Sequence, residues 1–322
     1  MSEFIRVVVL SSLEEVILHD DITAINSNVF YGCSSLEYIT LPANIVSMTG
    51  SAIFRSCTNL KSVTIPSGVK ELGNMMFDSC SSLEEVGLHD DIEKFGTYTF
   101  SNCKALRGIT LPANLKTMGA NAFSDSGISS IDIPEGITAL PDACFSNCAS
   151  LQAVSFPSAL EAIGNYAFRE CDALLEVMFP STLETLGRNA FYSCDRLTGM
   201  DFSNTGVTAI PDYFCYDCAA LVEILLPESL TLIGSNSFEY CDALAEVTIP
   251  ASVTEIKGWA FANNPLLTSV YLAPDSPPAL GNGTFDKAHS DCRIYVPVGS
   301  VEDYKSSWSA YASMIEPYSS GQ

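Results

Sequence analysis

The sequence predicts an α/β solenoid, in which about twelve coils of 23 residues stack along one axis and share a parallel sheet on one face. The first observation is a recurring pattern, I-G-x-x-A-F-x-x-C-x-x-L-x-x-V-x-L-P, which residues 163–180 follow closely. The second is composition, since 47% of the residues are hydrophobic and only 16% are charged. An ordinary domain has about 25% charged residues. A coil cannot bury its apolar face alone, so stacking with its neighbours must form the core.

Three columns of side chains define the register of the repeat. The leucine column consists of Leu13, Leu36, Leu60, Leu83, Leu106, Ile128, Leu151, Leu174, Leu197, Leu221, Leu244 and Leu267. The aromatic column consists of Phe30, Phe54, Phe77, Phe100, Phe123, Phe145, Phe168, Phe191, Cys215, Phe238, Phe261 and Phe285. The thiol column consists of Cys33, Cys57, Cys80, Cys103, Cys148, Cys171, Cys194, Cys218 and Cys241. Cys215 interrupts the aromatic column, and we expect Phe214 to supply the missing ring.

Each coil divides into two halves. The L-x-x-V-x-L-P half alternates apolar and polar residues, as residues 36–42 do, which is the period of a strand with one buried face. The I-G-x-x-A-F-x-x-C half has apolar residues at helical spacing and predicts a short helix. Its second position is glycine in eight coils but Pro141 and Pro211 in two others. Since proline cannot adopt positive φ, this position is predicted to avoid the left-handed conformation.

The ends of the chain depart from the repeat. We expect a solenoid over residues 1–272, with a ragged half coil over residues 1–12, and a last half coil and C-terminal cap over residues 273–322. Residues 293–297 are predicted to form a final strand. Ser300 is then predicted to cap a helix that seals the core with Val301, Tyr304, Trp308, Tyr311 and Ile315.

The charge balance excludes some partners. The chain has 38 acidic and 15 basic residues, a net charge of −23 and a pI near 4.2. Such a surface repels the phosphates of nucleic acids and anionic lipids, so we expect neither as a partner. We interpret the excess of acidic residues as serving solubility, and the alternative interpretation is that it attracts a basic partner. The apolar run at residues 4–10 is short and contains Arg6, so we expect no membrane-spanning segment and no signal peptide.

Enzymatic and metal-binding interpretations find little support. The sequence has three histidines and contains no G-x-S-x-G, H-E-x-x-H or phosphate-binding glycine motif, so we expect no catalytic residue and no cofactor. The triplets at residues 19–21 and 89–91 both read His-Asp-Asp, but they lie three coils, or about 14 Å, apart and cannot share one ion. We expect these aspartates to cap turns and no metal to bind. The cysteines are predicted to be buried free thiols, with Cys292 the most accessible.

The outward side of the strands is the remaining candidate site. Its first column reads Glu15, Tyr38, Ser62, Glu85, Gly108, Ser130, Ala153, Glu176, Gly199, Glu223, Glu246 and Ser269. The column beside it reads Ile17, Thr40, Thr64, Gly87, Thr110, Asp132, Ser155, Met178, Asp201, Leu225, Thr248 and Tyr271. Apolar residues ringed by acids suit a basic or amphipathic partner, and ordinary surface is the alternative. The predicted binding residues are Glu176, Met178, Asp201, Glu223 and Leu225.

The pattern L-x-x-V-x-L-P-x-x-L-x-x-I-G-x-x-A-F-x-x-C resembles the BspA-like leucine-rich repeats of bacterial surface proteins over about residues 10–285. Residues 292–317 resemble the closing segment of such proteins from host-associated anaerobic bacteria. The resemblance implies a leucine-rich-repeat right-handed superhelix that is secreted or held at the cell surface and binds a host matrix protein or a bacterial surface protein. It carries no catalytic residues. We expect a monomeric protein-binding or adhesion module, and the alternative is a structural spacer or display scaffold with no ligand on its strands.

Overall fold

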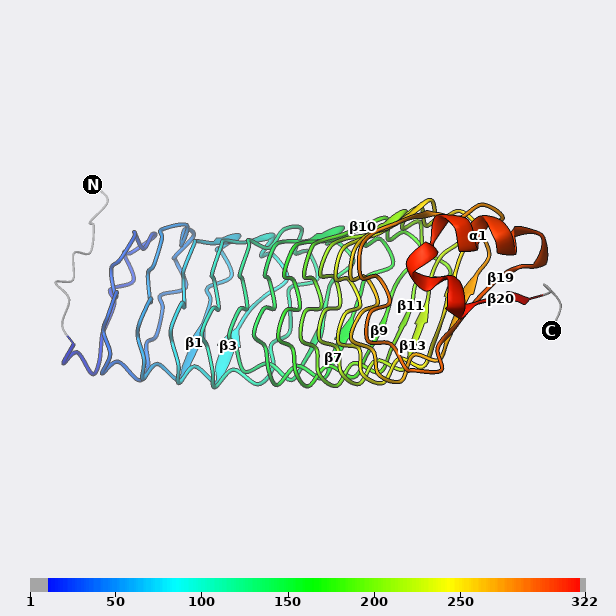
Figure 1. Cartoon of the computed structure of the whole chain (residues 1–322). Coiled ribbons are helices and arrows are strands. Elements are labelled where there is room, and N and C mark those ends of the chain that lie inside the picture. Colours follow the sequence, from blue (N-terminus) through cyan, green and yellow to red (C-terminus); the bar gives the residue numbers. More distant parts are fainter. Residues whose placement is uncertain (1–10, 319–322) are drawn as a thin grey trace. The chain divides into compact units, whose positions relative to one another are not determined.

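The computed structural model describes residues 11–318, which belong to two compact units, Met1–Leu160 and Glu161–Gln322. The predicted half coil at the N-terminus lies largely outside the described residues. Each unit is a parallel β-solenoid of the leucine-rich-repeat type, and together they contain about 11 turns of ~23 residues (Figure 1). The predicted fold class is therefore confirmed, with far less helix than the sequence suggested.

The first unit has seven short strands among its described residues, and three of its coils have two each. They are β1 (Ser62–Thr64), β2 (Glu71–Leu72), β3 (Glu85–Gly87), β4 (Lys94–Phe95), β5 (Ser130–Asp132), β6 (Ala139–Leu140) and β7 (Ala153–Ser155). Equivalent strands of neighbouring coils pair in parallel, as β1 with β3, β2 with β4 and β5 with β7. The register is one repeat per coil, so each outward column of the sequence becomes a row across the sheet.

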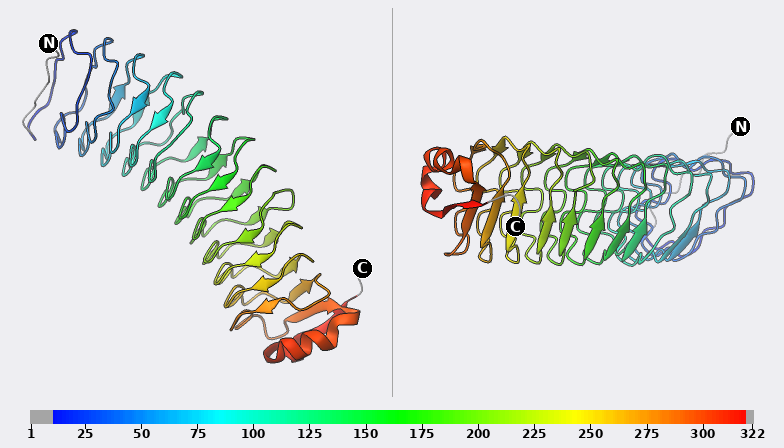
Figure 2. Two further views of the ribbon diagram at one scale, coloured as in Figure 1. Left: turned by 90° about the horizontal axis from the view of Figure 1, so that it is seen from above. Right: turned by 90° about the vertical axis from the view of Figure 1, so that its right-hand side faces the viewer.

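The second unit repeats this arrangement over more coils. Its strands are β8 (Ala162–Ile163), β9 (Glu176–Met178), β10 (Thr185–Leu186), β11 (Gly199–Asp201), β12 (Ala209–Ile210), β13 (Glu223–Leu225), β14 (Leu232–Ile233), β15 (Glu246–Ile249), β16 (Glu255–Ile256), β17 (Ser269–Leu272), β18 (Ala279–Leu280), β19 (Arg293–Pro297) and β20 (Ile315–Tyr318). One sheet follows the order β9, β11, β13, and another follows β15, β17, β19, β20. The arrows of the longer strands lie side by side along one face of this unit (Figure 2), and the two-residue strands β12, β14, β16 and β18 pair in a separate sheet.

The core is formed by the predicted columns. The ring centroids of Phe54 and Phe77 lie 5.5 Å apart in the first unit, and those of Phe238 and Phe261 lie 5.4 Å apart in the second. Phe214 is fully buried and contacts the aromatic column, so it supplies the missing ring as predicted. Stacked rings in this geometry add to the free energy gained from burying their apolar area.

The predicted helix in each coil is wrong. Residues 165–170 instead form turns in which Tyr166 and Glu170 have positive φ, 58° and 55°. The N–H groups of these two residues donate to the carbonyls of Arg188 and Tyr192 in the next coil, at 2.9 and 2.8 Å. The same two positions are left-handed in most coils. Apolar spacing of four residues suits a helix and this turn equally, so the pattern could not separate them.

Glycine at the second position of this half allows neighbouring coils to approach closely. A Cβ on Gly187 would overlap the backbone of Gly164, and one on Gly73 would overlap the backbone of Gly50. Neither glycine has positive φ, which agrees with the sequence prediction. The requirement is therefore for space between two backbones, which only a residue without a side chain leaves.

The twelve cysteines are buried and no disulfide joins them, as predicted. In the thiol column, Sγ of Cys80 donates to the carbonyl of Phe54 at 3.0 Å, and Sγ of Cys194 donates to that of Phe168 at 3.1 Å. The thiols thus serve as donors for carbonyls of the preceding coil. Burial raises the pKa of the Cys57 thiol to about 12. The expectation for Cys292 is wrong, because it is 0% exposed.

The C-terminal end has helix α1 (Val301–Ser307), the 3₁₀ helix η2 (Ser309–Met314) and then β20. The helix is shorter than predicted, since Ile315 belongs to a strand that pairs with β19. Ser300 precedes α1, but its hydroxyl donates to the carbonyl of Asp275 at 2.6 Å and makes no cap hydrogen bond.

Four of the five residues predicted for the apolar face of the C-terminal segment are buried, namely Tyr304, Trp308, Tyr311 and Ile315. The fifth, Val301, is half-buried. The polar tips of two of these side chains are satisfied, because the Tyr304 hydroxyl donates to the carbonyl of Pro274 at 2.8 Å and the Trp308 indole N–H donates to that of Pro278 at 3.0 Å. These bonds lock the helix onto the preceding coil.

Candidate functional site on the strand face

The second unit brings the predicted binding residues together. In the sheet, Asp201 pairs with Met178 of β9 on one side and Leu225 of β13 on the other. Met178 is 77% exposed and Leu225 is 42% exposed. Val177, which lies between Glu176 and Met178 in β9, is buried. The carboxylate of Asp201 accepts a hydrogen bond from the backbone N–H of Ser203 at 2.8 Å. Two exposed apolar side chains therefore flank a carboxylate held in place by its own turn.

A second row lies beside the first. Gly199 pairs with Glu176 on one side and Glu223 on the other, and both glutamates are exposed. A Cβ on Gly199 would meet only the carbonyl oxygen of Glu223, at 3.8 Å. The space above this glycine is open, with a carboxylate on each side. The two rows together offer negative charge beside apolar area, an arrangement that suits a cationic and partly apolar surface.

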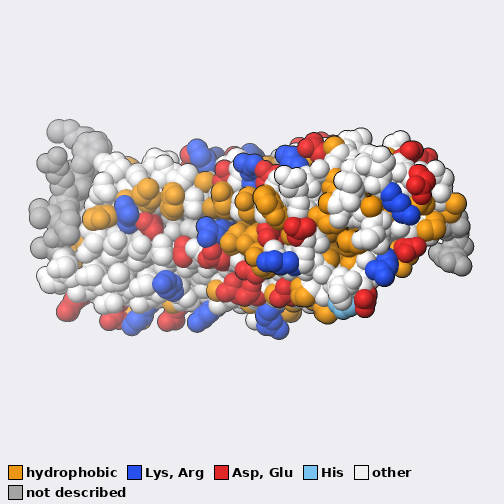
Figure 3. Space-filling model, in the orientation of Figure 1, with side chains coloured by type: hydrophobic (Ala, Val, Ile, Leu, Met, Phe, Trp, Pro, Cys, Tyr) orange, Lys and Arg blue, Asp and Glu red, His pale blue; other side chains and the backbone are white. Residues whose placement is uncertain are grey.

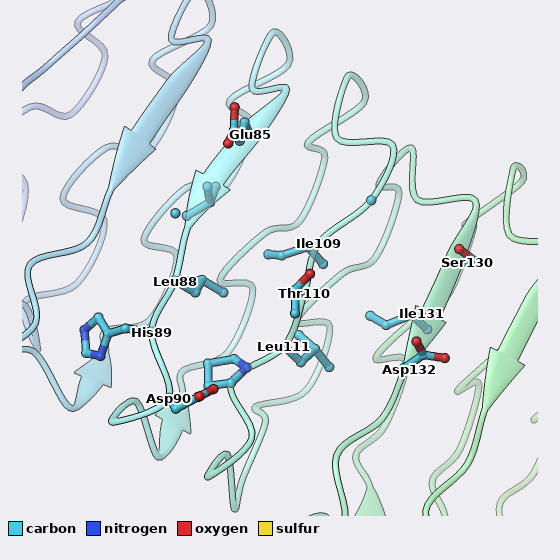
Figure 4. Close-up of a pocket in the computed structure, with 14 residues that line it drawn as sticks. Glu85, Leu88, His89, Asp90, Ile109, Thr110, Leu111, Ser130, Ile131 and Asp132 are labelled. Atoms are coloured by element: carbon cyan, nitrogen blue, oxygen red, sulfur yellow. The ribbon is translucent and has the colours of Figure 1, made fainter.

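The strand face of the first unit has a hollow that the sequence analysis did not identify. Its volume is about 610 Å³, and 14 residues of three successive coils line it (Figure 4). β3 forms one wall, β5 forms the other, and residues 108–112 form the floor between them. The signal available in the sequence was glycine at Gly87 and Gly108, two outward positions of neighbouring coils where the side chain is missing.

The coil that forms the floor is not part of a sheet. Residues 106–112 have no strand, although their sequence follows the repeat. The backbone N–H and C=O groups of residues 108–111 make no hydrogen bond with either neighbouring coil. β3 pairs away from this coil with β1, and β5 pairs away from it with β7. The first unit thus has a break in its strand face where backbone polar groups are unpaired.

Polar side chains surround the hollow. Glu85, Thr110 and Asp132 are exposed at its walls and floor. At one end, Asp90 accepts a hydrogen bond from the N–H of Ala113 in the next coil at 2.9 Å. Asp90 thus holds a turn in place, the role predicted for this aspartate. His89 lies on the same corner, and its Nε2 atom is 2.9 Å from the carbonyl oxygen of Pro66.

A second hollow of about 630 Å³ lies beside the first and shares the residues Gly87, Leu88 and His89 with it. At its far end the Tyr38 ring is exposed, and the ammonium of Lys61 lies 5.4 Å from the ring centroid. That ammonium also pairs with Glu37 at 2.6 Å, so its charge is already compensated.

The rest of the described surface has mixed character. Acidic, basic and hydrophobic side chains are interspersed on the face shown in Figure 3. Among residues 11–318, no group of three or more His, Cys, Asp and Glu side chains is arranged to hold a metal ion. Within the same residues, no helix combines the length and apolar character that crossing a membrane requires.

Comparison with known proteins places the chain in a family. A leucine-rich repeat protein from Bacteroides ovatus has 23% identity and a TM-score of 0.43, over 95% of this chain and 92% of that one. A leucine rich cell surface protein from Faecalibacterium prausnitzii has 22% identity and a TM-score of 0.45, over 93% and 84%. The pneumococcal vaccine antigen PcpA has 19% identity and a TM-score of 0.47, over 92% and 76%. No curated protein sequence matches. The family model described as "BspA type Leucine rich repeat region (6 copies)" matches overlapping segments from residue 9 to residue 308, so the chain belongs to this leucine-rich repeat family.

Proposed function

We propose that the chain is a protein-binding or adhesion module, secreted by a host-associated bacterium or held at its surface, with a host matrix protein or a bacterial surface protein as partner. Leucine-rich repeats of this kind are typically non-enzymatic binding modules. The observation that carries the proposal is the row Met178, Asp201 and Leu225, exposed on the paired strands β9, β11 and β13.

The physical support for this surface is its rigidity and its charge. Three paired strands hold the backbone of these residues in fixed positions, so the backbone loses little conformational entropy when a partner binds. Exposed apolar residues contribute binding energy, and carboxylates select a partner with basic residues. The net charge of −23 adds attraction at longer range and speeds association with a basic protein.

The test is a binding panel of matrix and bacterial surface proteins, in low salt and at about 0.5 M salt, where the Debye length falls to ~4 Å. The variant with Asp201→Lys and Glu223→Lys reverses two charges on the proposed surface. The matched control has Glu228→Lys and Glu255→Lys, two exposed positions outside the two rows. We expect salt-sensitive binding that the first variant weakens at least tenfold and the control leaves intact.

Two outcomes contradict the proposal. Equal losses in both variants mean that overall charge, and not this surface, attracts the partner. Absence of binding to any panel member, with circular dichroism showing an intact fold, favours the alternative of a structural spacer or display scaffold.

A further inference from the structure

The hollow between β3 and β5 lies over a position that has no side chain, Gly108. A Cβ built on Gly108 has no neighbouring atom within 4 Å. The equivalent positions on the flanking strands carry Glu85 and Ser130, whose side chains stand beside this empty place (Figure 4). The hollow's volume of about 610 Å³ falls in the range of ligand-binding clefts, roughly 300–1,000 Å³.

Its floor offers hydrogen-bonding groups that the fold leaves unpaired. In regular coils, backbone carbonyls of the strand face accept from the neighbouring coil, as Gly199 to Asp201 do in the second unit. Residues 108–111 make no such bonds. An unpaired backbone group costs free energy unless water or a ligand satisfies it. The carbonyl oxygens here are therefore available as acceptors.

The charge of the hollow has one sign. Among its 14 lining residues, Glu85, Asp90 and Asp132 are acidic, and there is no lysine or arginine. Arg107 is adjacent in sequence but lines a separate hollow of about 260 Å³ together with Lys104. Asp90 is engaged with Ala113 N–H, which leaves Glu85 and Asp132 as exposed carboxylates on opposite walls.

We propose that this hollow accepts a lysine or arginine side chain from a protein partner, between the carboxylates of Glu85 and Asp132 and over the carbonyls of residues 108–111. An ammonium or guanidinium group only donates hydrogen bonds, and carboxylates and carbonyls only accept them. Such bonds are charge-assisted and stronger than neutral ones. The inference rests on the proposed function, since it assigns the side-chain chemistry of the partner.

The first experiment uses protein labelled with ¹⁵N-glycine, which places reporters at Gly87, Gly108 and Gly299, an exposed glycine outside both proposed surfaces. Titration with N-acetyl-arginine amide at millimolar concentration is expected to shift the Gly108 and Gly87 amide signals and to leave that of Gly299 unmoved. N-acetyl-citrulline amide, which has the same shape and no charge, is expected to shift none of them. A Gly108 signal that stays still, or that moves equally with citrulline, overturns the proposal.

Variants localise the effect. Gly108→Trp fills the hollow with a side chain that meets no neighbouring atom at its Cβ, and the Gly87 signal should then stop responding. Gly199→Trp is the matched control on the second unit and should leave the response unchanged. Glu85→Gln with Asp132→Asn keeps the shape and should weaken binding at least fivefold. Unchanged affinity in this isosteric variant also overturns the proposal.

The two proposals fail separately. A response at Gly108 with no partner in the binding panel leaves a cation site in a chain whose protein-binding role is contradicted. A partner whose binding is lost in the Asp201→Lys, Glu223→Lys variant, with no response at Gly108, contradicts the hollow alone.

Discussion

Gly108 and Gly199 occupy the same column of the repeat, and their surroundings differ. Gly199 lies on β11, which pairs with a strand on each side, between Glu176 and Glu223. Gly108 lies in a segment, residues 108–111, that pairs with neither neighbouring coil, and a hollow opens over it. The missing side chain alone therefore does not create the hollow. Loss of the sheet hydrogen bonds around the glycine distinguishes the two sites.

The break in the first unit coincides with a change in coil length. The leucine column advances by 22 residues from Leu106 to Ile128, the shortest step in the chain. The shortened turn draws Gly127 against the preceding coil, where a Cβ would overlap the carbonyl of Lys104. At the same turn the thiol column is interrupted by Ser126. Near-identical repeats thus yield different surfaces where one coil loses a residue.

The largest effect expected from this comparison is in amide hydrogen exchange. The amides of residues 108–111 have no backbone acceptor, and those of β11 lie in a sheet paired on both sides. We expect the first set to exchange ~10³-fold faster, which corresponds to about 4 kcal/mol of opening free energy. Exchange followed by NMR or mass spectrometry measures the ratio. Equal protection of the two segments contradicts the break in the sheet.

The next effect separates two kinds of glycine. Gly187→Ala pushes Cβ into the backbone of the neighbouring coil and is expected to cost about 3 kcal/mol of unfolding free energy. Gly199→Ala points into open space and should change stability by less than about 0.5 kcal/mol. Gly73→Ala and Gly108→Ala form the same pair in the first unit. Chemical denaturation measures all four, and similar costs within a pair refute the packing argument.

A smaller effect tests whether the two units differ beneath the strand face. Cys80→Ala and Cys194→Ala each remove a buried thiol and one of two donors to the carbonyl of Phe54 or Phe168, which keeps its backbone N–H donor. Each is expected to cost about 2 kcal/mol. The serine variants keep a hydroxyl donor and should cost less. Costs that differ by more than about 1 kcal/mol between the units contradict the view that only their surfaces differ.

The smallest effect concerns Asp195 of the second unit, which directly follows Cys194 of the thiol column. Partial burial, and then the charge of Asp217, raises the pKa of Asp195. A carboxyl whose folded pKa exceeds its unfolded value, about 3.9, stabilises the fold below that pH and loses this contribution as the pH rises. Asp195→Asn should therefore stabilise the protein at pH 7, by less than about 0.5 kcal/mol because the group is exposed. Urea denaturation at pH 7 and near pH 3 checks this, and a gain that persists at pH 3 contradicts it.

The columns of the repeat were sufficient to predict the fold and the arrangement of the proposed binding residues. Strands stacked in register turn sequence columns into rows, which is why Met178, Asp201 and Leu225 could be placed side by side. The terminal aromatic face was equally visible, because Tyr304 and Trp308 recur at helical spacing. Both features depend on periodicity, which a single sequence contains.

Features that depend on backbone hydrogen bonds were not predictable. The turns with positive φ have the same apolar spacing as a helix, and residues such as Tyr166 and Glu170 give no hint of a left-handed conformation. The break in the sheet is similarly hidden, because residues 106–112 follow the repeat at every apolar position. The segment that fails to bond is the one whose coil ends in the shortened turn at Gly127, which lies outside the strand positions themselves.

Because the chain has a column of buried thiols, the outcome of exposure to an oxidant depends on whether the chain has already folded. Thiolate is the species that oxidants and disulfides react with, and a pKa of about 12 for Cys57 leaves about one in 10⁵ molecules reactive there at pH 7. An unfolded cysteine, with a pKa of about 8.5, is a few per cent thiolate at the same pH. A chain that folds before it meets an oxidising compartment keeps its thiols reduced, and one that unfolds there cross-links among twelve cysteines. Refolding the protein from denaturant therefore requires a reductant, whereas keeping the protein in its folded state does not.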